Sequence, residues 1–391
     1  MAAQVSMRYG CNPHQAPARS YRADGGELPL QVLNGGPSYI NLLDALNAWQ
    51  LVRELKGALG LPAAASFKHV SPAGAAVAVP LSDDLRAAYL LGKRKLSPLA
   101  TAYARARGGD CLASYGDWIA LSDRVDTATA RLIRAEASDG VIAPGYEPEA
   151  LELLKSKRGG SYRVFRIDAD YEPEALEQRQ VFGLTLEQPR NDFVPGADYL
   201  DQVVTRRRDL DEAARRDLVV ASLAVKYTQS NSICLALDGQ VVGTGAGQQS
   251  RVHCVRLAAG KADLWHLRRH PKVLGLEFRP GLKRTQIHNA VDLYLQEEAT
   301  TAELDVWKGN FDQVPEPLSA AEKRDWLDQL KGVALSSDAY LPFRDNIDRA
   351  ARSGVEYVVQ TGGSARDEEV VQAADECAMF MAFSGVRLFH H

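Results

Sequence analysis

The chain contains few cysteines and no long apolar run. Its cysteines are odd in number and far apart, so neither a disulfide framework nor a CxxC metal pair is indicated: Cys11, Cys111, Cys234, Cys254 and Cys377. No stretch approaches the roughly 20 apolar residues of a membrane span. Residues 1–22 also lack the apolar core of a secretory signal. We therefore expect a cytoplasmic protein with no membrane partner.

The chain also lacks an excess of basic residues. Its formal net charge is −4, so no general basic surface is available for nucleic acid, although local basic pockets remain open. Hydrophobic residues make up 46% and charged residues 25% of the chain, which is typical of a globular protein. A length of 391 residues is sufficient for one large core or two ordinary ones.

Two similar cycles of helix and strand indicate two related α/β lobes. The first has an amphipathic helix over 38–59 and an apolar strand over 63–70, followed by a turn at Ser71-Pro72-Ala73-Gly74. The second has a helix over about 210–227, a strand over 232–237 and an Asp238-Gly239 turn. Residues 271–331 are helical and polar, and the chain ends with a strand, a helix and another strand over 355–383.

Lys68 and His69 are the first residues that could carry chemistry, because they lie where a strand ends. Histidine exchanges protons near neutral pH, and lysine adds a fixed positive charge, a combination that suits acyl transfer. From the dipeptide alone, an ordinary strand-end lysine beside a half-buried histidine is the more common case.

Other segments could bind anions or a cation. The glycines from Gly243 to Gly247 form a predicted loop before a helix that starts near Gln248, and Arg251 follows. This spacing is not a dinucleotide fingerprint, and a plain turn is the alternative. Residues 227–232 are rich in hydroxyl and amide groups that could bind a hard cation or form a polar loop. Zinc motifs of deaminases and proteases are absent from the sequence.

Several motifs together resemble one family. They are R-Y-G-C-N-P-H-Q (8–15), S-F-K-H-V-S-P-A-G (66–74), K-Y-T-Q-S-N-S (226–232), G-A-G-Q-Q-S-R-V-H-C (245–254), S-S-D-A-Y-L-P-F-R-D-N (336–346) and R-L-F-H-H (387–391). With them the chain resembles aminoimidazole carboxamide ribonucleotide (AICAR) formyltransferase over nearly its whole length. Most relatives carry this domain behind an IMP cyclohydrolase domain. We expect a stand-alone transformylase or a fragment cut to one, with a separate cyclohydrolase open as a partner.

The resemblance implies an α/β fold with two cytidine-deaminase-like lobes, each a three-layer unit with a mixed sheet. Residues 1–200 would form the first lobe, 201–270 with 333–391 the second, and 271–332 a helical insertion. It also implies that the chain transfers the formyl group of 10-formyltetrahydrofolate to the amine of AICAR in purine biosynthesis. A catalytically inactive nucleotide- or folate-binding sensor of the same fold is the alternative, as is an ATP-using ligase, for which no P-loop is present.

The resemblance also assigns roles to individual residues. His69 matches the general base, Lys68 the lysine that stabilises developing charge, and Asn231 a residue that orients the formyl group. The expected nucleotide-binding residues are Arg8, Tyr9, Asn41, Arg251, Tyr340 and Arg387. The expected folate-binding residues are Leu112, Gly116, Asp139, Pro342, Asp345 and Asn346. A potassium ion is expected near Thr228, Ser230, Ser232, Asp338 and His390, with no zinc.

Relatives of this kind form homodimers with shared active sites, so the resemblance implies a dimer. Departures from the family pattern concentrate on the folate side, at C-L-A-S-Y (111–115), V-Q-T-G-G (359–363) and Ser384-Gly385. The resemblance is therefore weakest at the residues that would bind folate and its glutamate tail.

Overall fold

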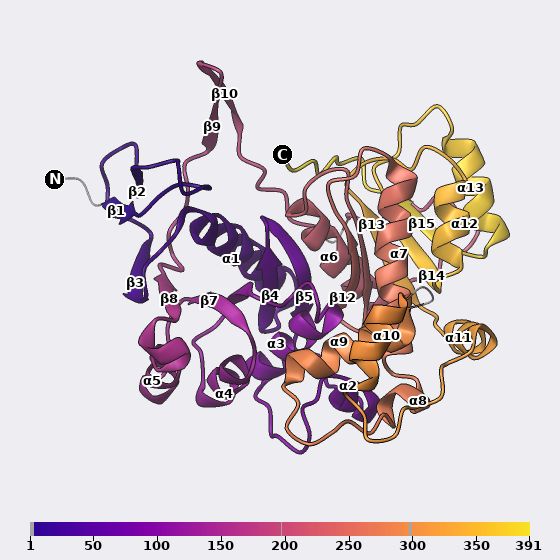
Figure 1. Cartoon of the computed structure of the whole chain (residues 1–391). Coiled ribbons are helices and arrows are strands. Elements are labelled where there is room, and N and C mark those ends of the chain that lie inside the picture. The colour runs from indigo at the N-terminus through magenta and orange to yellow at the C-terminus, as the bar shows by residue number, and fades with distance from the viewer. Residues whose placement is uncertain (1–3, 197, 297–298) are drawn as a thin grey trace.

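In the computed structural model, which describes residues 4–196, 198–296 and 299–391, one mixed sheet joins most of the strands (Figure 1). Its eleven strands run in the order β15 (Phe380–Phe383), β14 (Val355–Gln360), β13 (Val333–Ser337), β11 (Ile233–Leu237), β12 (Gln240–Gly245), β5 (Ser71–Val77), β4 (Ala63–Lys68), β6 (Asp117–Leu121), β7 (Ser138–Ala143), β8 (Arg163–Ile167) and β3 (Leu30–Asn34). The α/β fold expected from the sequence is confirmed.

Helices cover both faces of this sheet and make it the middle of three layers. One face carries α1 (Tyr39–Leu59) and α6 (Glu212–Lys226). The other carries α3 (Pro98–Gly109), α4 (Thr127–Ala135), α5 (Pro148–Lys155), α7 (Arg251–Leu267), α12 (Asp345–Ala351) and α13 (Asp367–Glu376). Successive residues of β4 point to opposite faces, so Ala63, Ala65 and Phe67 pack under α1 while Ala64 packs under α3.

The remaining elements lie outside these layers. They are the helices α2 (Asp83–Ala88), η1 (Lys157–Gly160), α8 (Pro271–Leu274), α9 (Arg284–Leu295), α10 (Thr301–Lys308) and α11 (Ala320–Leu327), and the ribbons β1 (Gln4–Met7) with β2 (Ala18–Tyr21) and β9 (Leu176–Val181) with β10 (Leu184–Pro189). Helices α8 to α11 pack around a small apolar core of their own, which includes Trp307 and Phe311. None of the helices in the described ranges has the length and apolar character needed to cross a membrane.

Two halves of the chain meet in the middle of the sheet. Helix α1 precedes the hairpin β4–β5, helix α6 precedes the hairpin β11–β12, and β12 pairs with β5 at Gln240 and Ala76. The repeated cycle predicted from the sequence is confirmed. The division into a first lobe, a second lobe and an insertion stays a prediction.

The turn predicted at Ser71-Pro72-Ala73-Gly74 is wrong, because these residues form the first half of β5. Lys68 pairs with Ser71, so the turn consists of His69 and Val70, with φ values of 53° and 59°. Neither residue is a glycine, and the turn therefore leaves no local signal in the sequence.

The glycine loop predicted over 243–247 is also displaced. Gly243 and Gly245 lie in β12, and α7 begins only at Arg251. A side chain at these two positions would collide with the carbonyl oxygens of Ala258 and Cys254 on α7. Their role is to let the helix approach the strand, and Gly247 alone takes a left-handed loop conformation, with φ of 64°.

Candidate functional site

Strand direction brings the predicted site segments to one edge of the sheet. Strand β4 ends there. Strands β5 and β6, which are antiparallel to β4, begin there, and so does β7, which is parallel to β6. In the second half of the chain, β12 and β13 end and β11 begins at the same edge. We call this the site edge. The strand ends, loops and helix start at this edge contain Lys68, His69, Asn231, Asp338 and the folate candidates, so residues from distant parts of the sequence are brought together.

The His69–Val70 turn projects from the site edge, and His69 is exposed. Two neighbours hold this turn. The Val70 amide donates to Asp44 Oδ1 at 2.7 Å, and Ser71 Oγ accepts the Gln229 amide at 3.3 Å. The second contact ties the turn to the loop that carries Asn231, so the candidate base and the candidate formyl-orienting residue lie on adjoining segments.

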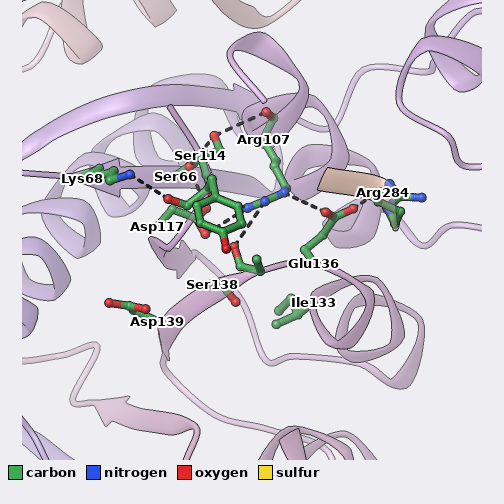
Figure 2. Close-up of polar contacts among 12 residues, drawn as sticks. Ser66, Lys68, Arg107, Ser114, Asp117, Ile133, Glu136, Ser138, Asp139 and Arg284 are labelled. Atoms are coloured by element: carbon green, nitrogen blue, oxygen red, sulfur yellow. Dashed lines mark hydrogen bonds and ion pairs between the residues drawn. The ribbon is translucent and has the colours of Figure 1, made fainter. Parts of the chain in front are cut away.

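Lys68 contacts the loop that contains two of the folate candidates. Its Nζ donates to the Tyr115 carbonyl at 2.7 Å, as Figure 2 shows at the left of the view. Leu112 and Gly116 belong to the same loop, between α3 and β6, and Asp139 lies on the neighbouring β7. Asp139 forms an ion pair with Arg158 at 2.9 Å. The structure thus places Lys68 beside the segment predicted to bind folate.

A buried polar network is in contact with this loop (Figure 2). The Arg107 guanidinium donates to Asp117 Oδ1 at 2.9 Å and to the Ser114 carbonyl at 2.7 Å, and it pairs with Glu136 at 3.1 Å. Asp117 is fully buried and accepts the Ser66 hydroxyl at 2.7 Å. Because Ser114 adjoins Tyr115, the network fixes the backbone that holds Lys68.

Charges in the network balance one another. Burial alone would raise the pKa of Glu136, but Arg107 and Arg284 outweigh it and lower that pKa. Nearby, Lys157 Nζ donates to Ser138 Oγ at 2.6 Å and to the Ile133 carbonyl at 2.8 Å. Burial lowers the pKa of Lys157 to about 8.

Asn231 and Arg251 are joined in a second polar cluster. Arg251 Nη2 donates to Asn231 Oδ1 at 2.9 Å and Nη1 donates to the Ser232 carbonyl at 3.0 Å, and Arg251 also forms a buried ion pair with Asp338. The Asn231 amide nitrogen donates to the Gln248 carbonyl at 2.8 Å. These contacts fix the loop after α6. A phosphate contact from Arg251 stays a prediction.

The oxygen-rich residues predicted around potassium also gather at this cluster. Ser230 and His390 exchange hydrogen bonds at 3.0 Å, through the Ser230 hydroxyl and the two backbones. Asp338 Oδ2 accepts the Ser232 amide at 3.0 Å. The Ser232 hydroxyl is buried without a hydrogen-bond partner, and Thr228 lies buried close by on the same loop.

The remaining nucleotide candidates lie in four segments. Arg8 is exposed and Tyr9 half-buried after β1, next to an open pocket of about 540 Å³ lined in part by Gly10, Gln15 and Tyr39. That volume is in the range of small-molecule sites. Asn41 is buried at the start of α1, where its side chain accepts the Ser38 hydroxyl at 2.7 Å.

Tyr340 and Arg387 complete the nucleotide set, and both are exposed. The Arg387 guanidinium lies over the Phe389 ring at 4.6 Å from its centre. The folate candidate Pro342 lies between β13 and α12, and Asp345 and Asn346 are the first two residues of α12. The Asn346 Oδ1 atom is buried without a partner. The ligand contacts of these residues stay predictions.

Comparison with known proteins identifies the family. A model described as AICARFT/IMPCHase bienzyme matches residues 1–261. The chain belongs to the AICARFT/IMPCHase bienzyme family. It is 33% identical over 393 residues to the bifunctional purine biosynthesis protein PurH of Roseobacter denitrificans, with 99% of this chain and 60% of the relative covered.

Two further relatives are similar to the chain over nearly its whole length. PurH of Magnetococcus marinus is 34% identical, with 98% of this chain and 59% of the relative covered. PurH of Xylella fastidiosa is 31% identical, with 99% and 58% covered. The chain therefore spans about three fifths of the length of these relatives.

Sequence reasoning missed the residues that support the site. Asp44 on α1 and the pair Arg107 and Asp117 are charged groups in otherwise ordinary patterns, and their partners lie far away in the sequence. Asp44 follows two leucines on a helix that otherwise packs against the sheet, and this interruption of the apolar face was the available signal.

Proposed function

We propose that the chain is a formyltransferase of purine biosynthesis, which transfers the formyl group of 10-formyltetrahydrofolate to the amine of AICAR. Family membership supports this proposal, because the relatives are purine biosynthesis proteins. The observation that carries it is the contact between the His69–Val70–Ser71 hairpin and the Gln229–Asn231 loop, at 3.3 Å from Gln229 N to Ser71 Oγ. This contact joins the segments that carry His69 and Asn231 at the site edge.

The chemistry requires one proton to be moved. The amine nitrogen of the nucleotide attacks the formyl carbon, the bond from that carbon to the folate nitrogen breaks, and the amine proton must leave. His69 would accept that proton, and a positioned base typically contributes about 10² to 10⁴ in rate. Lys68 would stabilise the developing oxyanion and help protonate the departing folate nitrogen.

The binding roles are those that the family resemblance implies. Arg8, Arg251 and Arg387 would contact the nucleotide phosphate, since guanidinium groups suit bidentate contacts. Tyr9, Asn41 and Tyr340 would surround the base and ribose. The folate would lie against the loop held by Lys68, next to Asp139 on one side and, on the other, the 342–346 segment.

A monovalent cation fits the cluster beside Asn231. The orphaned Ser232 hydroxyl is buried next to the Asp338 carboxylate, and hard cations prefer oxygen ligands of this kind. Thr228, Ser230 and His390 would complete the surroundings of a potassium ion. Such an ion would fix the loop that carries Asn231.

The assay of this proposal is an absorbance change on mixing AICAR with 10-formyltetrahydrofolate, with and without ATP. Turnover without ATP supports formyl transfer and rejects an ATP-using ligase. Binding of both ligands without turnover would favour the catalytically inactive sensor. Absence of binding and turnover would reject both functions.

We also propose that two copies of the chain associate through the β9–β10 ribbon. Figure 1 shows this ribbon projecting away from the body, and every residue of its two strands is exposed. Val181, Leu184 and Leu186 lie on one of its faces, because Val181 pairs with Leu184, and Phe182 at the tip is fully exposed. An isolated ribbon is marginally stable in water, so a covering surface is needed.

Replacing Phe182 and Leu184 together by serine is expected to weaken the dimer about 10²-fold, because each buried apolar side chain contributes about 1.5 to 3 kcal/mol. Sedimentation velocity over a concentration series measures the change. The matched control is Gln180→Ser with Thr185→Ser, which alters the opposite, polar face of the same ribbon. Equal dimerisation of the two double variants would reject the ribbon as the interface.

A further inference from the structure

The turn that carries His69 has an unfavourable backbone. His69 and Val70 both take left-handed φ values, 53° and 59°. Two-residue hairpin turns of this type strongly prefer Asn-Gly or Asp-Gly, because glycine alone adopts positive φ without cost. A β-branched residue such as Val70 is a clear outlier there. Such a conformation persists only where surrounding contacts enforce it.

Asp44 supplies the enforcing contact. It lies in the first turns of α1 with 6% of its surface exposed, and its Oδ1 accepts the Val70 amide at 2.7 Å. Burial raises the pKa of Asp44, whereas the amides of Val70 and His69 and the charge of His69 oppose that rise. The Asp44 carboxylate therefore holds the turn through the Val70 amide.

The second half of the chain contains the same device. Asp217 on α6 is 2% exposed, and its carboxylate accepts the amides of Asp238 at 2.7 Å and Gly239 at 2.6 Å. These two residues form the β11–β12 turn, with φ values of 53° and 72°. The β11–β12 turn lies at the edge of the sheet opposite to the site edge.

The two turns differ in one informative way. Asp238-Gly239 adopts the required conformation readily, whereas His69-Val70 does not. A buried aspartate is therefore an added support in the second half and the main support in the first. The presence of this unfavourable pair at the site edge points to a functional role of His69 there.

We propose that Asp44 is a positioning residue, which holds the His69–Val70 turn in its left-handed conformation so that His69 faces the reacting amine. This inference rests on the proposed formyl transfer. It assigns to Asp44 a role exerted through the turn backbone, and no contact with substrate.

Asp44→Leu keeps the size of the side chain and removes the acceptor. We expect kcat to fall about 10²-fold, because small misplacements of a catalytic group cost that much, while the KM values for nucleotide and folate change less than about threefold. Asp44→Asn keeps an acceptor for the Val70 amide and should retain most of the activity. Asp217→Leu is the matched control, which should lower Tm and leave kcat unchanged.

A rescue separates positioning from a general loss of structure. Val70→Gly removes the penalty for positive φ, so in the Asp44→Leu background it should restore at least about tenfold of the lost kcat. Lack of rescue in a folded double variant, or equal losses in Asp44→Asn and Asp44→Leu, would overturn the proposal.

Amide exchange makes the result independent of activity. Asp44→Leu should speed hydrogen exchange at Val70 and leave the β11–β12 turn unchanged, which supports the hold on the turn even if the wild-type chain transfers no formyl group. A wild-type chain without turnover would refute the proposed function alone. An active wild-type chain whose Asp44→Leu variant exchanges and turns over normally would refute the positioning role alone.

Discussion

His69→Ala is expected to lower kcat by about 10²-fold or more, the usual effect of removing a general base. The amine of the proposed nucleotide is a weak nucleophile, because its lone pair is delocalised into the ring and the carboxamide. Its proton must be removed as the bond to the formyl carbon forms. His69 is exposed at the site edge, so it can reach a bound ligand without first leaving a buried position.

The measurement is steady-state kinetics with both substrates varied. Since His69 acts on the reacting amine, kcat should fall while nucleotide affinity, measured by calorimetry, stays within about threefold. His270→Ala is the control, because His270 lies before α8 in the helical segment and packs against Trp326. Near wild-type kcat in His69→Ala would show that another group is the base.

The elements with strong local signals were predicted well from the sequence. Helix α1 begins after Ser38, whose hydroxyl accepts the Asn41 amide, as the apolar periodicity and the serine cap indicated. The Asp238-Gly239 turn has the sequence that its backbone requires. In both cases the residues that determine the structure are neighbours along the chain.

The predictions that failed depend on distant contacts. The His69–Val70 turn is held by Asp44, which lies on the preceding helix, and no glycine marks it. Gly243 and Gly245 were predicted to form a loop, but they lie in β12. Glycine is needed at both positions because α7 packs closely on β12. The β9–β10 ribbon was not predicted from the sequence. In the structure its turn consists of Phe182 and Gly183, which both have positive φ values.

The candidate site shows the same division. Lys68, His69 and Asn231 could be named from motifs, and the structure places their segments at one edge. Motifs could not show that Arg251 is already paired with Asp338 in the interior. Nor could motifs show that Arg107 holds the loop between α3 and β6, which Lys68 contacts, because the members of that network come from several separate elements.

Arg107→Met is expected to lower the free energy of unfolding by about 3 to 5 kcal/mol, the usual cost of removing one partner from a buried ion pair. Asp117 has no exposed surface, and without Arg107 its carboxylate would keep the Ser66 hydroxyl as its side-chain donor. Burial lowers the pKa of Arg107, but Asp117 and Glu136 outweigh that effect and raise it, so the guanidinium remains charged. Urea unfolding at unchanged m-value measures the loss.

The loss of stability in Arg107→Met should arise from the unpaired charge of the buried Asp117 carboxylate, and a second variant tests this cause. Arg107→Met combined with Asp117→Asn removes both charges of the pair, so it should be more stable than Arg107→Met alone, because no carboxylate remains buried without its cation. Arg131→Met breaks the exposed pair with Glu149, whose side chains are 66% and 64% exposed, and should not change stability measurably. If Arg107→Met and Arg131→Met proved equally stable, the network would contribute nothing to the fold, and the support of the loop beneath Lys68 would have to come from its backbone alone.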